Sequence, residues 1–154
     1  MPLPASHPHP RYGVSGYRED EVDGRMSWSC ELLRHGQGFG LVGGEDDGPH
    51  RYTFTDEARG EEFLAAARAL HPDAAAPADV LVDELLTVRQ MNALDQVAYC
   101  FDEDRFEESG EHRVADPGLT FEQVRELLAT RYAAHHPRVW DRTRSAMVPV
   151  APAD

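Results

Sequence analysis

The chain has no lysine, so all 15 of its basic side chains are arginines. This absence excludes the glycine-loop phosphate site of protein kinases, which needs a lysine on a neighbouring strand. Gly38, Gly40 and Gly43 match the formula GxGxxG. A turn and another strand are predicted after them, where a dinucleotide site needs a helix. We therefore expect no nucleotide cofactor, and no other cofactor is indicated.

Cysteine is also scarce. Cys30 and Cys100 are the only two, with no CxxC pair, which excludes a cysteine-based zinc cage. Each has apolar neighbours, so we expect buried packing residues rather than thiols activated by a histidine. Whether the two cysteines pair is left open, and reduced thiols are the expectation for a reducing cytosol.

Long hydrophobic runs are missing as well. No stretch approaches the roughly 20 apolar residues that cross a bilayer, and the opening residues MPLPASHPHPRYG contain no apolar core of signal-peptide length. The sequence predicts a cytoplasmic protein that does not insert into membranes.

Acidic side chains are abundant, and the formal net charge is −13. Between Glu19 and Glu126 there are 26 Asp and Glu residues against 9 arginines. A field of this sign repels nucleic-acid phosphates and anionic lipids and attracts basic protein surfaces. We expect a basic protein partner and no nucleic-acid partner. The oligomeric state is left open.

The length of 154 residues fits one domain. Prolines at 2, 4, 8 and 10 and the absence of periodicity predict a flexible N-terminal arm over residues 1–23. We expect a single α+β domain over residues 24–147 and a C-terminal tail over 148–154.

Three strands are predicted in the first half of the domain. Residues 26–33 alternate apolar and polar side chains, as do residues 51–55. Residues 37–42 place Phe39 and Leu41 on one face and Gly38 and Gly40 on the other, so a backbone or a ring can approach closely there. Short neighbouring strands favour an antiparallel meander.

Three helices are predicted after the strands. Thr55 and Asp56 can cap a helix that runs to Leu70. An apolar stripe from Leu81 to Phe101 indicates a second helix, although residues 80–88 also fit a strand. Thr120 with Gln123 forms a capping box for a third helix, which ends before Pro137. The fold class is therefore α+β, a three-stranded antiparallel meander followed by three helices, with disordered N- and C-terminal tails.

Two acidic segments and one basic segment are the candidate contact regions. The loop that starts at Asp102 misses the calcium-binding EF-hand spacing, which favours a solvated acidic surface. The basic segment 131–144 either folds back on that loop or forms a docking helix. The predicted partner-binding residues are Glu45, Asp46, Asp47, Asp102, Glu103, Asp104, Phe106, Glu107, Glu108, Trp140 and Arg142.

These features favour an acidic protein-binding module, such as an immunity, inhibitor or accessory protein, that docks on a basic protein surface. The alternative is a small enzyme, metal-dependent or not, that acts on a small molecule. In that hypothesis His35, His50 and His112 would be metal ligands or the acid and base. No HExxH pair or other converging motif supports the enzyme, so the binding module is preferred.

Overall fold

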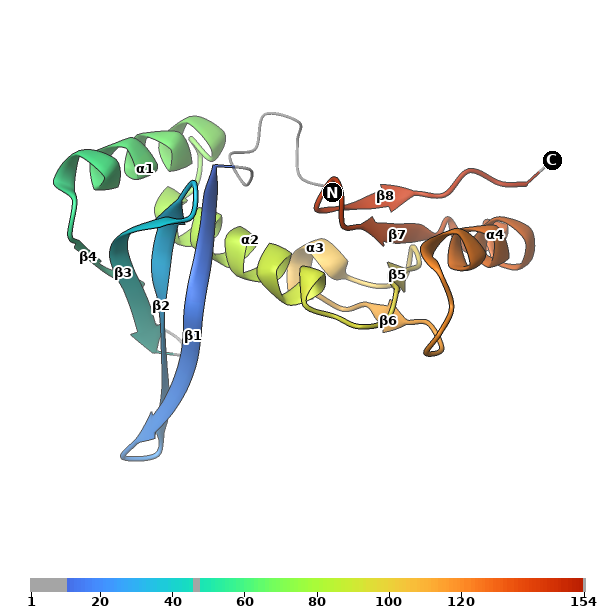
Figure 1. Ribbon diagram of the computed structural model, residues 1–154, viewed down its shortest axis with the longest axis horizontal. Coiled ribbons are helices and arrows are strands. Elements are labelled where there is room, and N and C mark those ends of the chain that lie inside the picture. The colour runs from blue at the N-terminus through green and yellow to red at the C-terminus, as the bar shows by residue number, and fades with distance from the viewer. Residues whose placement is uncertain (1–10, 46–47, 154) are drawn as a thin grey trace. The chain divides into compact units, whose positions relative to one another are not determined.

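The computed structural model describes residues 11–45 and 48–153. An α+β architecture is confirmed, with two antiparallel four-stranded sheets (Figure 1). The predicted meander of three strands followed by three helices is wrong in its detail. The first sheet has four strands, and the strands of the second sheet lie between and after the helices along the chain. Contacts divide the chain into two compact units, one ending at Arg89 and the other starting at Gln90. No helix in the described residues is long and apolar enough to span a membrane.

The first unit is built on sheet A, whose strands follow in the order β1-β2-β3-β4. They are β1 (Tyr12–Val22), β2 (Arg25–Arg34), β3 (Gln37–Glu45) and β4 (Arg51–Phe54). The last three confirm the strands predicted over residues 26–33, 37–42 and 51–55. β1 and β2 form a hairpin that extends beyond the ends of β3 and β4 (Figure 1).

β1 corrects the prediction of a flexible arm over residues 1–23. Tyr12 and Val14 are buried, and only residues 1–10 of that range lie outside the described chain. Ser15 pairs with Glu31 whereas Arg18 pairs with Ser29, so β1 holds one extra residue between them. Gly16 adopts the left-handed φ of +63° that such a bulge uses. The bulge interrupts the period-two pattern, and residues 18–22 are exposed, so the strand is hard to recognise from sequence.

A second bulge changes the predicted faces of β3. Leu32 pairs with Gly40 and Leu33 with Gly38, which leaves Phe39 as the extra residue. Phe39 is buried while Leu41 is 52% exposed, so these two side chains do not share a face. The predicted close approach at Gly40 is confirmed, because a Cβ there would lie 2.9 Å from the Phe54 ring.

Two helices complete the first unit and cover part of sheet A. α1 (Glu57–Leu70) begins as predicted, with the Asp56 side chain accepting a hydrogen bond from the Arg59 amide at 3.1 Å. α2 (Pro77–Asn92) follows. The core lies between the helices and the sheet, and its largest fully buried side chains are Phe39, Phe63, Leu32, Leu81 and Leu85.

α2 ends at Asn92, so the predicted helical stripe to Phe101 is wrong in its last part. Residues Ala98–Cys100 form strand β5, in which Ala98 and Cys100 are buried on either side of the half-buried Tyr99. Three residues of alternation are too short to be separated from a helical stripe by periodicity alone.

The second unit holds the other sheet, with strand order β6-β5-β7-β8. Its remaining elements are α3 (Phe106–Ser109), β6 (Arg113–Val114), α4 (Phe121–Arg131), a 3₁₀ turn (Ala133–His135), β7 (Arg138–Asp141) and β8 (Ala146–Pro149). The Thr120–Gln123 capping box is confirmed. The predicted docking helix at 131–144 is instead β7 and a turn, and the tail predicted from residue 148 begins only after β8.

Candidate functional site

The predicted acidic contact residues are divided between the two units, with Glu45 in the first and residues 102–108 in the second. Glu45 lies at the end of β3, where its carboxylate is 3.7 Å from the Arg25 guanidinium and 3.4 Å from that of Arg51. Asp46 and Asp47 lie outside the described residues. Glu45 is therefore already balanced by two arginines of its own sheet.

The acidic loop of the second unit is balanced in the same way. Asp104 accepts two hydrogen bonds from Arg113, at 2.9 and 3.2 Å, and one from the Phe101 amide at 2.8 Å. The Arg113 hydrogen bonds and the Phe101 amide hold the pKa of Asp104 below its usual range. Glu103 also lies 3.6 Å from Arg113, while Asp102 is exposed.

The predicted apolar anchors of this surface are packing residues. Trp140 is only 4% exposed, and its indole N–H donates to Asn92 at 2.9 Å. Phe106 is half-buried, with its ring centroid 6.1 Å from that of Trp140. Arg142 is exposed. Glu107 and Glu108 lie in α3, and their side chains are outside the described part of the structure.

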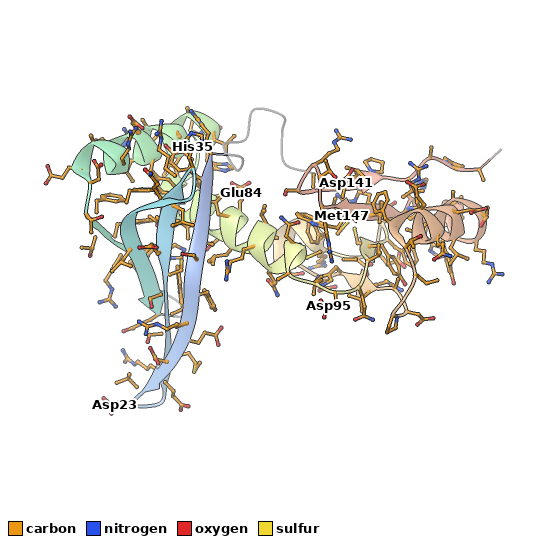
Figure 2. The ribbon with its side chains drawn as sticks, in the orientation of Figure 1. Asp23, His35, Glu84, Asp95, Asp141 and Met147 are labelled. Atoms are coloured by element: carbon orange, nitrogen blue, oxygen red, sulfur yellow. The ribbon has the colours of Figure 1, made fainter. Side chains whose placement is uncertain are left out.

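The candidate histidines are divided between the two units. His35 lies in the β2–β3 turn, at the opposite end of β2 from the hairpin tip at Asp23 (Figure 2), and His50 directly precedes β4. His112 belongs to the second unit, where it contacts the Gly110 carbonyl at 2.7 Å. Within residues 11–45 and 48–153, no group of three or more His, Cys, Asp or Glu side chains could hold a metal ion.

Both cysteines are buried, as the sequence predicted for packing residues. Burial raises the pKa of Cys30 to about 11, with a small opposing effect from Arg89. A thiol that stays protonated near neutral pH is a poor nucleophile.

The candidate contact residues that were not predicted from the sequence lie at the end of sheet A that carries the β1–β2 hairpin. The strand register aligns Glu19 of β1 with Trp28 of β2, and Trp28 with Gly44 of β3. Glu21 is likewise opposite Met26. Paired residues share a face of the sheet. Closer to the core, the same face of β2 carries the buried Cys30 and Leu32. The face that packs on the core therefore continues onto the hairpin, where it carries the exposed carboxylates Glu19 and Glu21.

Trp28 is the centre of this face. The Tyr17 ring stacks on it at 6.2 Å between centroids, and the His50 ring meets it edge-on at 4.8 Å. Gly44 lies close to the Trp28 ring, since a Cβ there would be in tight contact with the indole nitrogen at 3.3 Å and in ordinary contact with His50 Nδ1 at 3.6 Å. The result is an aromatic platform with the Glu19 position on one side and His50 on the other.

His50 is fixed by carboxylates at the start of α2. Its Nε2 lies 2.9 Å from Asp83, and its backbone amide donates to Asp79 at 3.1 Å. Asp79 also accepts the Tyr52 hydroxyl at 2.7 Å. Burial, the Asp79 hydrogen bond and the nearby carboxylates raise the pKa of Tyr52 well above its ordinary value. The buried Nδ1 atom of His50 has no hydrogen-bond partner among the described residues.

We call the exposed end of this face the hairpin surface. Its aromatic and apolar members are Tyr17, Met26 and Trp28, and its carboxylates are Glu19 and Glu21. Tyr17 is 41% exposed and Met26 is 36% exposed. Asp23 adds an exposed carboxylate at the hairpin tip (Figure 2), and the exposed Asp20 lies on the opposite face of β1. A surface of this composition suits a partner that carries both cationic and apolar groups.

The second unit contains a groove of about 500 Å³, but its acids are partly engaged. Asp141 accepts hydrogen bonds from the Thr143 and Arg144 amides, and Glu122 pairs with Arg125 at 3.1 Å. The groove therefore offers less uncompensated charge than the hairpin surface.

Comparisons with family models, with curated proteins and with solved structures found no match to this chain.

Proposed function

We propose that this chain is a non-catalytic, acidic protein-binding module that docks on a basic surface of another protein through the hairpin surface. This function is the one expected from the sequence. The proposed contact surface differs, because it lies on the β1–β2 hairpin rather than at residues 45–47 and 102–108. The observation that carries it is that the exposed Tyr17 and the half-buried Trp28 adjoin Glu19 and Glu21, two exposed carboxylates for which the described residues supply no arginine partner.

The charge of the hairpin supports a cationic partner. Glu19, Asp20, Glu21 and Asp23 are all exposed, against Arg18 and Arg25 in the same segment. Arg25 lies 3.7 Å from Glu45, so part of its charge is already balanced. An arginine or lysine of the partner could lie against the exposed Tyr17 ring and meet Glu19, whose carboxylate accepts the Tyr17 hydroxyl at 2.8 Å. This would combine a cation–π contact with an ion pair.

In this proposal, the predicted contact residues of the second unit contribute less to binding than those of the hairpin. Asp102 and Glu103 are exposed and can attract a basic surface. Because Arg113 already contacts Glu103 and Asp104, that loop offers a weaker cation site than the hairpin.

The enzyme hypothesis has one observation in its favour, the His50–Asp83 pair at 2.9 Å. A general base needs a ring nitrogen within reach of the substrate proton. Nε2 of His50 is engaged by Asp83 and Nδ1 is buried, while the nearby Cys30 stays protonated. This arrangement supports a structural role for His50, which holds the start of β4 against α2.

A charge-reversal experiment tests the docking site. The probe is a fluorescent peptide of alternating arginine and threonine, measured by anisotropy at low and high salt. We expect the double variant Glu19→Arg/Glu21→Arg to weaken binding about tenfold or more, which corresponds to about 1.4 kcal/mol. The matched control Glu61→Arg/Asp73→Arg changes net charge equally at exposed positions away from the hairpin, and it should stay within about twofold.

Equal weakening in both double variants would mean that only total charge matters, and it would overturn the proposed site. Absence of peptide binding by the unmodified protein at low salt would overturn the function. Circular dichroism of each variant establishes that the fold is retained.

A further inference from the structure

We infer that the basic partner binds as an extended segment that adds a fifth strand to sheet A along Arg18–Val22 of β1. This inference rests on the proposed function and specifies its binding mode. Strand addition uses main-chain hydrogen bonds for affinity and alternate side chains for specificity.

The open edge of β1 supplies the main-chain groups. β1 is the last strand in the order of sheet A, and within the described residues it pairs only with β2. Every other backbone N–H and C=O of an edge strand points away from the sheet and can pair with another chain. The outer edge of β1 is therefore a template for one more strand.

The bulge selects which part of β1 can serve as this template. The extra residue between Ser15 and Arg18 breaks the regular ladder. From Arg18 to Val22 the register against β2 is continuous, ending with Val22 opposite Arg25. An added strand can follow this regular segment, and the bulge marks where its pairing ends.

The side chains beside this edge select a basic strand. Glu19 and Glu21 point to the face that carries Trp28, and Asp20 points to the other face. A segment with arginine or lysine at alternate positions would place its charges opposite Glu19 and Glu21. Opposite charges across neighbouring strands are stabilising.

The same charges disfavour a second copy of this chain at the edge. In a symmetric antiparallel pairing of residues 18–22, Glu19 would be opposite Glu21 and Asp20 would be opposite Asp20. Like charges directly opposite are destabilising, and charged edges are a known protection against self-pairing. The edge therefore favours pairing with a cationic strand and disfavours pairing with a second copy of this chain.

Backbone methylation of the probe tests this mode. The alternating arginine–threonine peptide is compared with two derivatives, one N-methylated at the arginines and the other at the threonines. In an added strand, the amides of one residue type face β1 and those of the other face solvent. We expect one derivative to lose binding by about tenfold or more and the other to stay within about twofold of the parent.

Similar affinity for the parent and both derivatives would overturn strand addition and leave the proposed function standing, because the peptide would then bind through side chains alone. Equal loss in both derivatives would also overturn strand addition. Failure of the parent peptide to bind would instead contradict the proposed function itself.

Discussion

Individual glycines set how closely the layers of the first unit approach. Gly60 in α1 faces the Phe54 ring, and a Cβ at this position would lie 2.5 Å from it. The constraint at Gly44 is weaker, since a Cβ there would lie 3.3 Å from the Trp28 ring. The sequence predicted a glycine face on β3 but not its ring neighbours, since those depend on the register between strands.

The variant Gly60→Ala should destabilise the protein by about 1–3 kcal/mol, because the added methyl overpacks the contact between α1 and β4. Helix propensity alone would give the opposite sign, a gain of about 1 kcal/mol. Urea unfolding measures the difference. Gly13→Ala is the matched control, since nothing lies within 4 Å of its Cβ. A gain in stability for Gly60→Ala would show that α1 does not pack closely against the Phe54 ring.

Cys30 should make stability fall as the solution becomes alkaline. Its pKa is about 11 in the folded chain against an ordinary value of 9.0. Below about pH 9 both states keep the thiol proton. As the pH rises toward 11, only the unfolded state loses it, and the folded state is disfavoured. Tyr52, with its raised pKa, acts in the same direction.

Urea midpoints near pH 8 and pH 10 measure this effect. The variant Cys30→Ala should lose less stability between the two pH values than the unmodified protein. An identical fall in both would show that the Cys30 thiolate is not disfavoured in the folded state.

At the scale of elements, signals at helix ends were read correctly from the sequence. Asp56 and the Thr120–Gln123 box cap α1 and α4 as predicted. These signals are local, because a cap bonds to a backbone amide two or three residues away. The strands of the second sheet were not predicted. β5, β6, β7 and β8 are two to four residues long, and such short segments obtain their structure from pairing with distant residues.

Asp104 links the end of β5 to β6, within a segment that was predicted from the sequence only as an acidic loop. It accepts from the Phe101 amide after β5 and from Arg113 of β6. Its lowered pKa means that its contribution to stability is present above the ordinary Asp range, near pH 4, and is lost as the pH falls through the folded value.

Asp104→Asn should therefore lower the urea midpoint at pH 7, and this difference from the unmodified protein should shrink as the pH falls through the lowered pKa of Asp104. Glu103→Gln is the control. Its carboxylate is exposed and 3.6 Å from the same arginine, so its effect at pH 7 should be small. Equal effects of the two variants would show that Asp104 is not the anchor of this segment.

At the scale of the whole molecule, composition favours a cationic partner but does not indicate which carboxylates could contact it. The net charge of −13 is a property of the sequence. Which carboxylates remain available depends on pairing. Arginines contact Glu45, Glu103 and Asp104, whereas the hairpin projects Glu19, Asp20 and Glu21 from a strand that the sequence did not reveal.

The most direct measurement is a nuclear magnetic resonance titration of the amide signals with the alternating arginine–threonine peptide. The account predicts that the largest shifts fall between Arg18 and Trp28 and that they disappear at high salt, where ion pairs are screened. Shifts concentrated between Asp102 and Arg113, or spread evenly over exposed acids of both units, would contradict a docking site on the hairpin.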